Sequence, residues 1–151
     1  MNNQPESERA IPLDLRASLQ DREHLAQKFQ HFQNAFHEEG LLDKRLLELC
    51  RTRIDALHSM PATTTRDEET QALVTQGQFS SFTQIEQQAL SIAEQMAIDA
   101  HGVTDQQVTA LVAELGEAAA VSLITAASMH DATVRMQLVM NDLGTSNKAS
   151  R

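Results

Sequence analysis

The stretch LLDKRLLELCRTRIDAL, residues 41–57, predicts a helix, and the other predicted elements are placed relative to it. Asp43 is a suitable N-cap, because its carboxylate can accept a hydrogen bond from a free backbone N–H in the first turn. Apolar residues then recur at helical spacing and form one stripe: Leu46, Leu47, Cys50, Ile54 and Leu57. A polar stripe follows the same period: Glu48, Arg51, Thr52 and Asp55. The segment therefore predicts an amphipathic helix from Asp43 to about His58.

The same periodicity predicts helices on both sides of this segment. Residues 19–39 carry one apolar helical face, and Gly40 then offers a stop; the face comprises Leu25, Phe29, Phe32 and Phe36. The stretch SMPATTTRDEE, residues 59–69, predicts a break and then a short helix near residues 67–76, ended by Gly77.

Two capping boxes mark the next helices. Thr83 with Glu86 begins a helix that extends to about Ala100. Thr104 with Gln107 begins a shorter helix that ends at Gly116. In both, the Thr hydroxyl can accept a hydrogen bond from the backbone N–H of the residue three places later. The side chain of that later residue can accept one from the backbone N–H of the Thr.

A final helix is predicted for residues 117–143, and it is apolar on two faces. One face carries Leu123, Ala127, Val134 and Leu138, and the other carries Met129, Met136 and Met140. A helix of this kind must be covered on several sides, and a chain of 151 residues has few helices to cover it. We therefore expect burial against another subunit.

Composition places the chain in the all-α class. Hydrophobic residues make up 41% of its 151 residues, enough for one core, and Trp and Tyr are both absent. We expect about five to six helices in one domain, residues 19–144. A flexible N-terminal arm, residues 1–18, precedes the domain, and a disordered tail, residues 145–151, follows it.

Charge and cysteine content indicate which partners and which cellular compartment to expect. The formal charge of −9 disfavours nucleic acids and anionic membranes, and no apolar run approaches the length of a membrane span. The single cysteine cannot form an intramolecular disulfide, which fits a cytoplasmic protein. The three histidines His24, His31 and His37 do not share a face at metal-ligand spacing, and no phosphate loop or other cofactor motif is present, so we expect neither a metal nor a cofactor.

Three segments, taken together, resemble the alkylhydroperoxidase D-like and carboxymuconolactone decarboxylase superfamily. They are residues 41–57, residues 77–97 and residues 103–144, and they cover about the last two thirds of the chain. Asp131 and Arg135 fall where many members of that superfamily have Asn and Arg. The resemblance implies a helical homo-oligomer, either a trimer or a hexamer built as a dimer of trimers.

The thiol peroxidase branch of this superfamily has a Glu, eleven residues, Cys-x-x-Cys and a His four places after the second Cys. On this sequence the Glu matches Glu48, whereas the two Cys fall at Met60 and Thr63 and the His at Asp67. Met cannot ionise and Thr cannot form a disulfide, so the thiol route is lost. Cys50 lies on the apolar stripe, and we interpret it as a buried structural residue.

Several side chains remain as candidate site residues, each with a simpler alternative. Glu48 is either a catalytic carboxylate or the partner of Arg51 in an i,i+3 pair. His58 is a candidate acid or base, or an ordinary histidine at a helix C-terminus. His130, with Asp131, could orient a ligand, or it is a buried structural residue. Further binding candidates around a cleft between subunits are Arg51, Arg53, Asp55, Met60, Thr63 and Asp67.

Two functions remain open. The first is a non-redox binding or assembly module that keeps the fold without the peroxidase centre. The second is an enzyme that acts on a small hydroperoxide, lactone or carboxylate in a cleft between subunits, without a Cys pair. The decarboxylase branch makes the second interpretation possible, because it works without those cysteines.

Overall fold

The computed structural model describes residues 22–38, 40–61 and 67–148, apart from the side chains of residues 37, 38 and 141–148. Within these ranges the chain is helical and has no β-strand, which confirms the all-α class. The elements are α2 (Glu23–Glu38), α3 (Lys44–Leu57), α4 (Glu68–Gln76), α5 (Gln84–Asp99), the short 3-10 helix η3 (Ala100–Gly102), α6 (Asp105–Leu115) and α7 (Glu117–Lys148).

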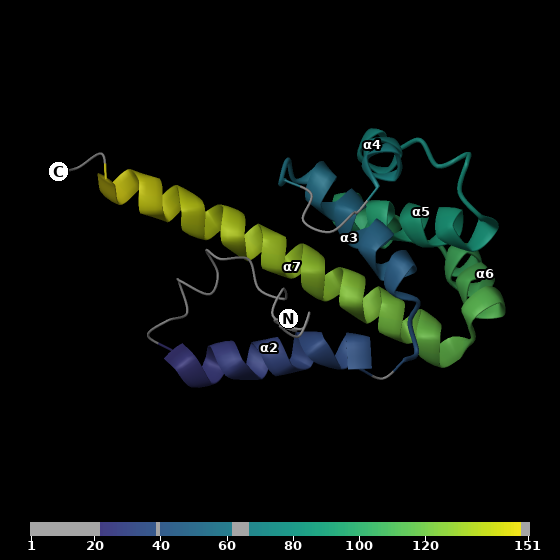
Figure 1. The fold of residues 1–151 in the computed structure, drawn as a ribbon, viewed down its shortest axis with the longest axis horizontal. Helices are drawn as coiled ribbons and strands as arrows, with labels where there is room; N and C mark the ends of the chain where they lie inside the picture. The colour runs from purple at the N-terminus through teal and green to yellow at the C-terminus, as the bar shows by residue number, and fades with distance from the viewer. Residues whose placement is uncertain (1–21, 39, 62–66, 149–151) are drawn as a thin grey trace, which may run out of the picture.

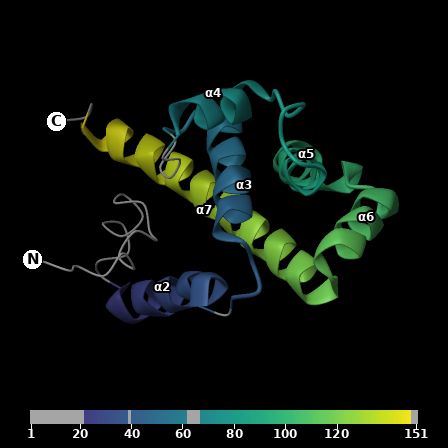
Figure 2. The ribbon, with the colours of Figure 1, turned by 45° about the vertical axis from the view of Figure 1, so that its right-hand side comes forward.

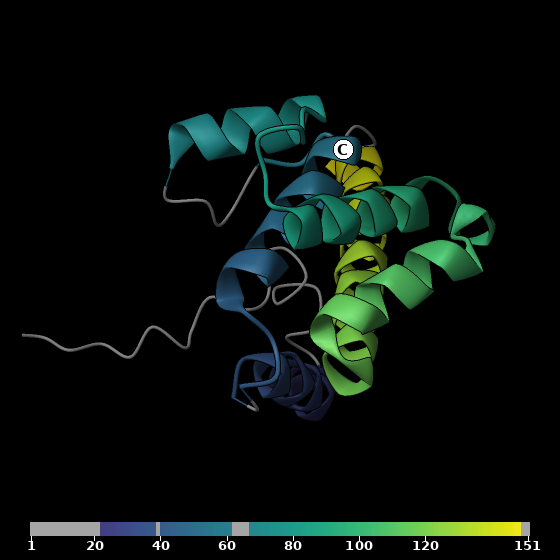
Figure 3. The same ribbon diagram turned by 90° about the vertical axis from the view of Figure 1, so that its right-hand side faces the viewer.

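Helix α7 is the longest element and forms the axis of the fold. It runs diagonally through Figure 1, with α2 on one side of it and helices α3 to α6 on the other. Helix α3 crosses α7 and also contacts α4 and α5, and α6 connects α5 to α7 (Figure 2). Figure 3, which turns the right-hand side of Figure 1 forward, shows α2 separated from α4 and α5 by α3 and α7.

Helix α3 begins and ends where its local chemistry requires. The Asp43 carboxylate accepts a hydrogen bond from the N–H of Arg45 at 2.8 Å, as predicted for the N-cap. At the other end, Ser59 takes a left-handed conformation with φ of 57°, and the N–H of Met60 donates to the carbonyl of Asp55 at 2.8 Å. This is the usual way in which a left-handed residue closes a helix.

The later boundaries were also predicted. Both capping boxes are formed, by Thr83 with Glu86 and by Thr104 with Gln107. Gly77 ends α4 in the left-handed conformation, φ 73°, which a residue with a side chain seldom adopts. The Glu86 carboxylate also binds Arg45 at 2.7 Å and so joins the first turns of α5 and α3.

The core forms around α3. Its apolar stripe, which includes Cys50, packs with residues of α5, α6 and α7, among them Ile92, Leu111 and Leu123. A smaller cluster joins α3 to α4 and α5 through Leu49, Val74, Phe82 and Leu90. Interlocking burial of this kind is what holds a short α-helix, since intrinsic propensity alone is too weak.

The C-terminal end of the last helix differs from the prediction. Helix α7 extends to Lys148, so its predicted end near Leu143 was too early, and residues 145–148 of the expected tail are helical. Residues 149–151 and the predicted arm, residues 1–18, lie outside the described residues. Among the helices of the described part, none combines the length and the apolar character that a membrane span needs.

Helix α2 is turned away from the expected orientation. Of its predicted apolar face, Phe36 packs against the core, but Leu25 is 54% exposed and Phe32 is 41% exposed. Among the α2 residues whose side chains are described, the most buried is instead Gln33, at 6% exposure, and its side-chain oxygen has no hydrogen-bond partner. The apolar face of α2 is therefore only partly covered within one chain.

Candidate functional site

The polar stripe of α3 is partly buried, and its Asp55 contacts α7. Thr52 is fully buried, and its hydroxyl donates to the carbonyl of Glu48 at 2.9 Å. Asp55, one turn further on, is 3% exposed. A buried carboxylate is costly unless it is paired, so the residues around Asp55 are the natural place to look for a functional arrangement.

Two histidine and aspartate pairs cross between α3 and α7. His130 Nε2 lies 2.7 Å from Asp55 Oδ1, and His58 Nε2 lies 2.6 Å from Asp131 Oδ1. Because an ionised carboxylate can only accept, Nε2 is the donating nitrogen in both pairs. Each helix supplies one His and one Asp, and we call these four residues the His–Asp cluster.

Spacing along the two helices explains the crossed arrangement. Asp55 and His58 are three residues apart, which places them on one face of α3. His130 and Asp131 are neighbours in α7, and both contact α3, which crosses α7 (Figure 2). Each Asp therefore meets the His of the other helix.

Two arginines extend the cluster. Burial lowers the pKa of Arg51 below its ordinary value, and the nearby carboxylates of Asp55 and Glu48 oppose that change. Arg135 donates from Nε to Asp131 Oδ2 at 2.8 Å and from Nη2 to the carbonyl of Ala97 at 2.7 Å. The second contact fixes the C-terminal part of α5 to α7.

The cluster is partly accessible. The side chains of His58 and His130 are each 15% exposed, and those of Asp131 and Asp55 are 18% and 4% exposed. An imidazole held by a carboxylate has a fixed orientation and can exchange a proton with a small molecule that reaches it. In the part of the chain that the structure describes, no group of three or more His, Cys, Asp or Glu residues could hold a metal ion.

Arg53, another candidate binding residue, makes structural contacts between helices. The Arg53 side chain binds Glu94 at 2.8 Å, donates to the carbonyls of Val74 and Thr75 at 3.2 and 2.8 Å, and lies over the Phe79 ring. It therefore ties α3 to α4 and α5.

Asp67 is the N-cap of α4. The Thr70 hydroxyl and the Glu69 N–H donate to its carboxylate, and these bonds lower the pKa of Asp67. Glu48 is half-buried near Arg51, which fits the simpler interpretation of an i,i+3 neighbour. Met60 is half-buried just after α3, and Thr63 lies outside the described residues, so their predicted place beside a cavity remains a prediction.

Sequence analysis identified His58 and His130 singly but missed that each pairs with an aspartate of the other helix. The signal was present as Asp-x-x-His in residues 55–58 and His-Asp in residues 130–131. Comparisons with protein-family models, with curated proteins and with solved structures give no match. The superfamily resemblance therefore depends on the sequence segments alone.

Replacing Asp55 should destabilise the protein more than replacing Asp131. Asp55→Ala leaves the largely buried Arg51 and His130 without this carboxylate, so we expect a loss of about 3 to 5 kcal/mol in the free energy of unfolding. Asp131→Ala removes a more exposed partner and should cost about 1 to 2 kcal/mol. Urea unfolding measures both, and equal losses would contradict the difference in burial.

Proposed function

We propose that this protein is a non-redox assembly module, a helical subunit of the alkylhydroperoxidase D-like type that associates with copies of itself. The observation that carries this proposal is the outer face of α7. Of the exposed residues between 118 and 139, whose side chains the structure describes, Arg135 alone carries a charge. The large apolar residues Val121, Met136 and Val139 are 57%, 43% and 61% exposed.

The polar groups on this face are already satisfied. The hydroxyls of Thr125 and Ser128 donate to the carbonyls of Val121 and Ile124 at 2.8 Å each. Neither hydroxyl needs water, so both can be buried at a helix–helix contact at low cost. The guanidinium of Arg135 is bound to Asp131 and Ala97, which draws it toward α5 and away from this face.

The length of α7 gives room for a subunit interface. Helix α7 has 32 residues, so it is about 48 Å long. Its C-terminal part extends beyond helices α3, α4, α5 and α6 (Figure 1). Together with the half-covered face of α2, it offers apolar surface of the kind that marks protein–protein contacts. The superfamily resemblance favours a homotrimer or a hexamer.

A charge on the outer face of α7 should weaken self-association. We expect the unmodified protein to be oligomeric by light scattering and Val139→Glu to shift it toward monomer, with a dissociation constant roughly 10-fold or more higher. Ile98→Glu is the matched control, because Ile98 is 63% exposed and belongs to α5 and not to α7. A monomer without any substitution, or equal effects of both substitutions, would count against the proposal.

The burial of Cys50 supports the proposal that this protein carries out no redox chemistry. Its side chain is completely buried in the core cluster, and burial raises the pKa of the thiol to about 12, although Arg51 acts in the opposite direction. Thiolate formation and access to oxidant are the two conditions for cysteine redox chemistry, and both are unfavourable here.

Cys50 should therefore be unreactive while the protein is folded. We expect a disulfide reagent such as DTNB to label it at mildly alkaline pH only after unfolding in guanidinium chloride, with one thiol per chain appearing then. Cys50→Ala should leave peroxide consumption with a dithiol donor at the background rate. Rapid labelling of the folded protein would contradict the structural role.

A second candidate function has one specific observation in its favour, the His–Asp cluster. Two imidazoles, each oriented by a carboxylate and each 15% exposed, are suitable general acids or bases. An enzyme that hydrolyses a small lactone could use them without a thiol: an imidazole takes a proton from the water that adds to the carbonyl carbon, and the ring C–O bond breaks as its oxygen is protonated.

Hydrolysis of a simple lactone discriminates between the two functions. As an assembly module, the protein should give no more turnover than buffer, and His58→Gln and His130→Gln should change stability only. Turnover that either variant abolishes, with the oligomer and the folded state intact, would instead establish the enzyme.

A further inference from the structure

The three methionines of α7 lie along one edge of its outer face. Steps of seven and four residues place Met129, Met136 and Met140 on one side of the helix. Met136 lies three residues before Val139 and is 43% exposed, whereas Met129 and Met140 are half-buried. The two methionines outside α7 that the structure describes are half-buried as well. Met136 is therefore the described methionine that solvent reaches most easily.

A methionine sulfur reacts with hydroperoxides. Its lone pair takes the outer oxygen of the hydroperoxide, the O–O bond breaks, and the proton on the transferred oxygen passes to the departing oxygen. Sulfur is oxidised by two electrons to the sulfoxide, and the hydroperoxide is reduced to an alcohol, or to water if it is hydrogen peroxide. Because Cys50 is completely buried, the Met136 thioether is the more accessible sulfur.

Oxidation changes what the outer face of α7 can bury. A sulfoxide is polar, so its oxygen needs a hydrogen-bond donor once water is removed. The four side chains one turn away are Ala132, Thr133, Val139 and Met140, and the Thr133 hydroxyl already donates to the carbonyl of Met129 at 2.7 Å. None of these four offers a free donor. A second copy that covers the face with its own apolar residues adds none, so the sulfoxide weakens the contact.

We infer that Met136 is an oxidation site that regulates self-association: a hydroperoxide converts its thioether to the sulfoxide, and the subunits then separate. This inference rests on the proposed function, because it concerns the same face of α7. The oxidant reaches Met136 on free subunits that exchange with the oligomer, and an oxidised subunit returns to it less readily. The reaction modifies the protein once per subunit, so it does not make the protein a peroxidase.

Light scattering before and after treatment with hydrogen peroxide tests the inference. We expect tandem mass spectrometry to find Met136 oxidised before Met129 and Met140. As this sulfoxide forms, the dissociation constant of the oligomer should rise roughly 10-fold or more. Methionine sulfoxide reductases with dithiothreitol should restore the oligomer, since two thiols become a disulfide and the sulfoxide oxygen leaves as water. Earlier oxidation of Met129 or Met140 would overturn the inference.

Matched variants assign the effect to one sulfur. Met136→Leu is similar in volume and cannot be oxidised, so it should stay oligomeric in peroxide. Met140→Leu should dissociate as the unmodified protein does. Met136→Gln places a polar group at this position permanently and should weaken association without peroxide. Dissociation of Met136→Leu in peroxide would refute the role of this methionine.

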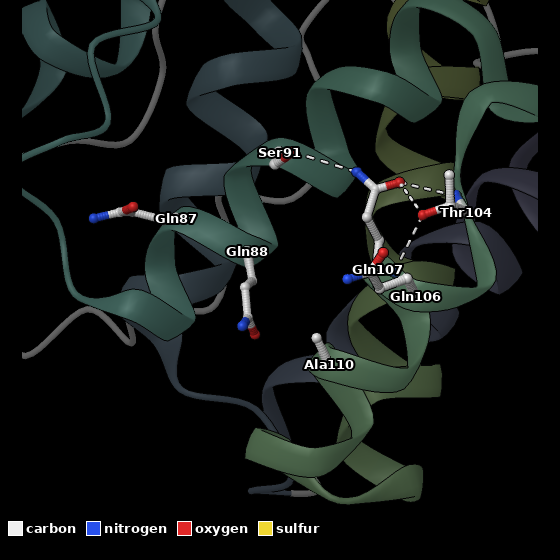
Figure 4. Close-up of a pocket in the computed structure, with 7 residues that line it drawn as sticks. All are labelled: Gln87, Gln88, Ser91, Thr104, Gln106, Gln107 and Ala110. Carbon is white, nitrogen blue, oxygen red and sulfur yellow. Dashed lines mark hydrogen bonds between the residues drawn. The ribbon is translucent and has the colours of Figure 1, made fainter.

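A hollow between α5 and α6 provides an internal control for the fold (Figure 4). Its volume is about 290 Å³, and none of its seven lining residues contains sulfur. Gln107 Nε2 lies 3.4 Å from the hydroxyl oxygen of Ser91 and bridges the two helices there. On oxidation, the backbone ¹H–¹⁵N signals of Ala132 and Val139 should shift, while those of Ser91 and Gln107 should not. Equal shifts in both pairs would mean that peroxide loosens the whole fold, which would overturn the inference.

The oligomeric state of the untreated protein separates this inference from the proposed function. A monomer before oxidation overturns the proposed function, and the regulation with it. An untreated oligomer whose dissociation constant does not change when Met136 becomes the sulfoxide overturns the regulation alone.

Discussion

The fold depends on how the charges of α3 are buried against α7. Asp55 is almost inaccessible, and the cationic or donating groups around it come from both helices: Arg51 from α3 and His130 from α7. A buried carboxylate that lost these partners would cost several kcal/mol, so α3 and α7 must keep the register that pairs them. The second pair, His58 with Asp131, fixes the same register one turn further along α3.

This register also determines which face of α7 turns outward. With His130, Thr133 and Val134 directed toward the interior, Val121, Ala132 and Val139 lie on the opposite side of the helix. The largely apolar outer face is therefore a consequence of the same pairing that holds the inner one. A helix with burial on one side and apolar exposure on the other fits a subunit that is completed by association.

Local chemistry made the all-α class and most of the helix boundaries predictable from the sequence. Asp43, Thr83 and Thr104 act within one turn of their own position, so the helix starts they predict need no knowledge of the rest of the chain. The orientation of α2 and the pairing of His58 and His130 depend on contacts between distant segments. Periodicity shows which residues share a face, but not what that face meets. It therefore could not predict that Gln33 is buried while Phe32 is exposed.

The geometry of α3 also separates sulfur from the acid–base groups. Cys50 and Asp55 are five residues apart, about 140° around the helix, so the thiol points into the apolar cluster while the carboxylate points to the imidazole of His130. The charged neighbour of the thiol is Arg51, and its attraction for a thiolate does not overcome the cost of burial. Activation of Cys50 by the His–Asp cluster would require α3 to rotate, and that rotation would break both pairs with α7. The two faces of one helix thus keep a buried thiol and a polar cluster in the same small domain without letting them act together.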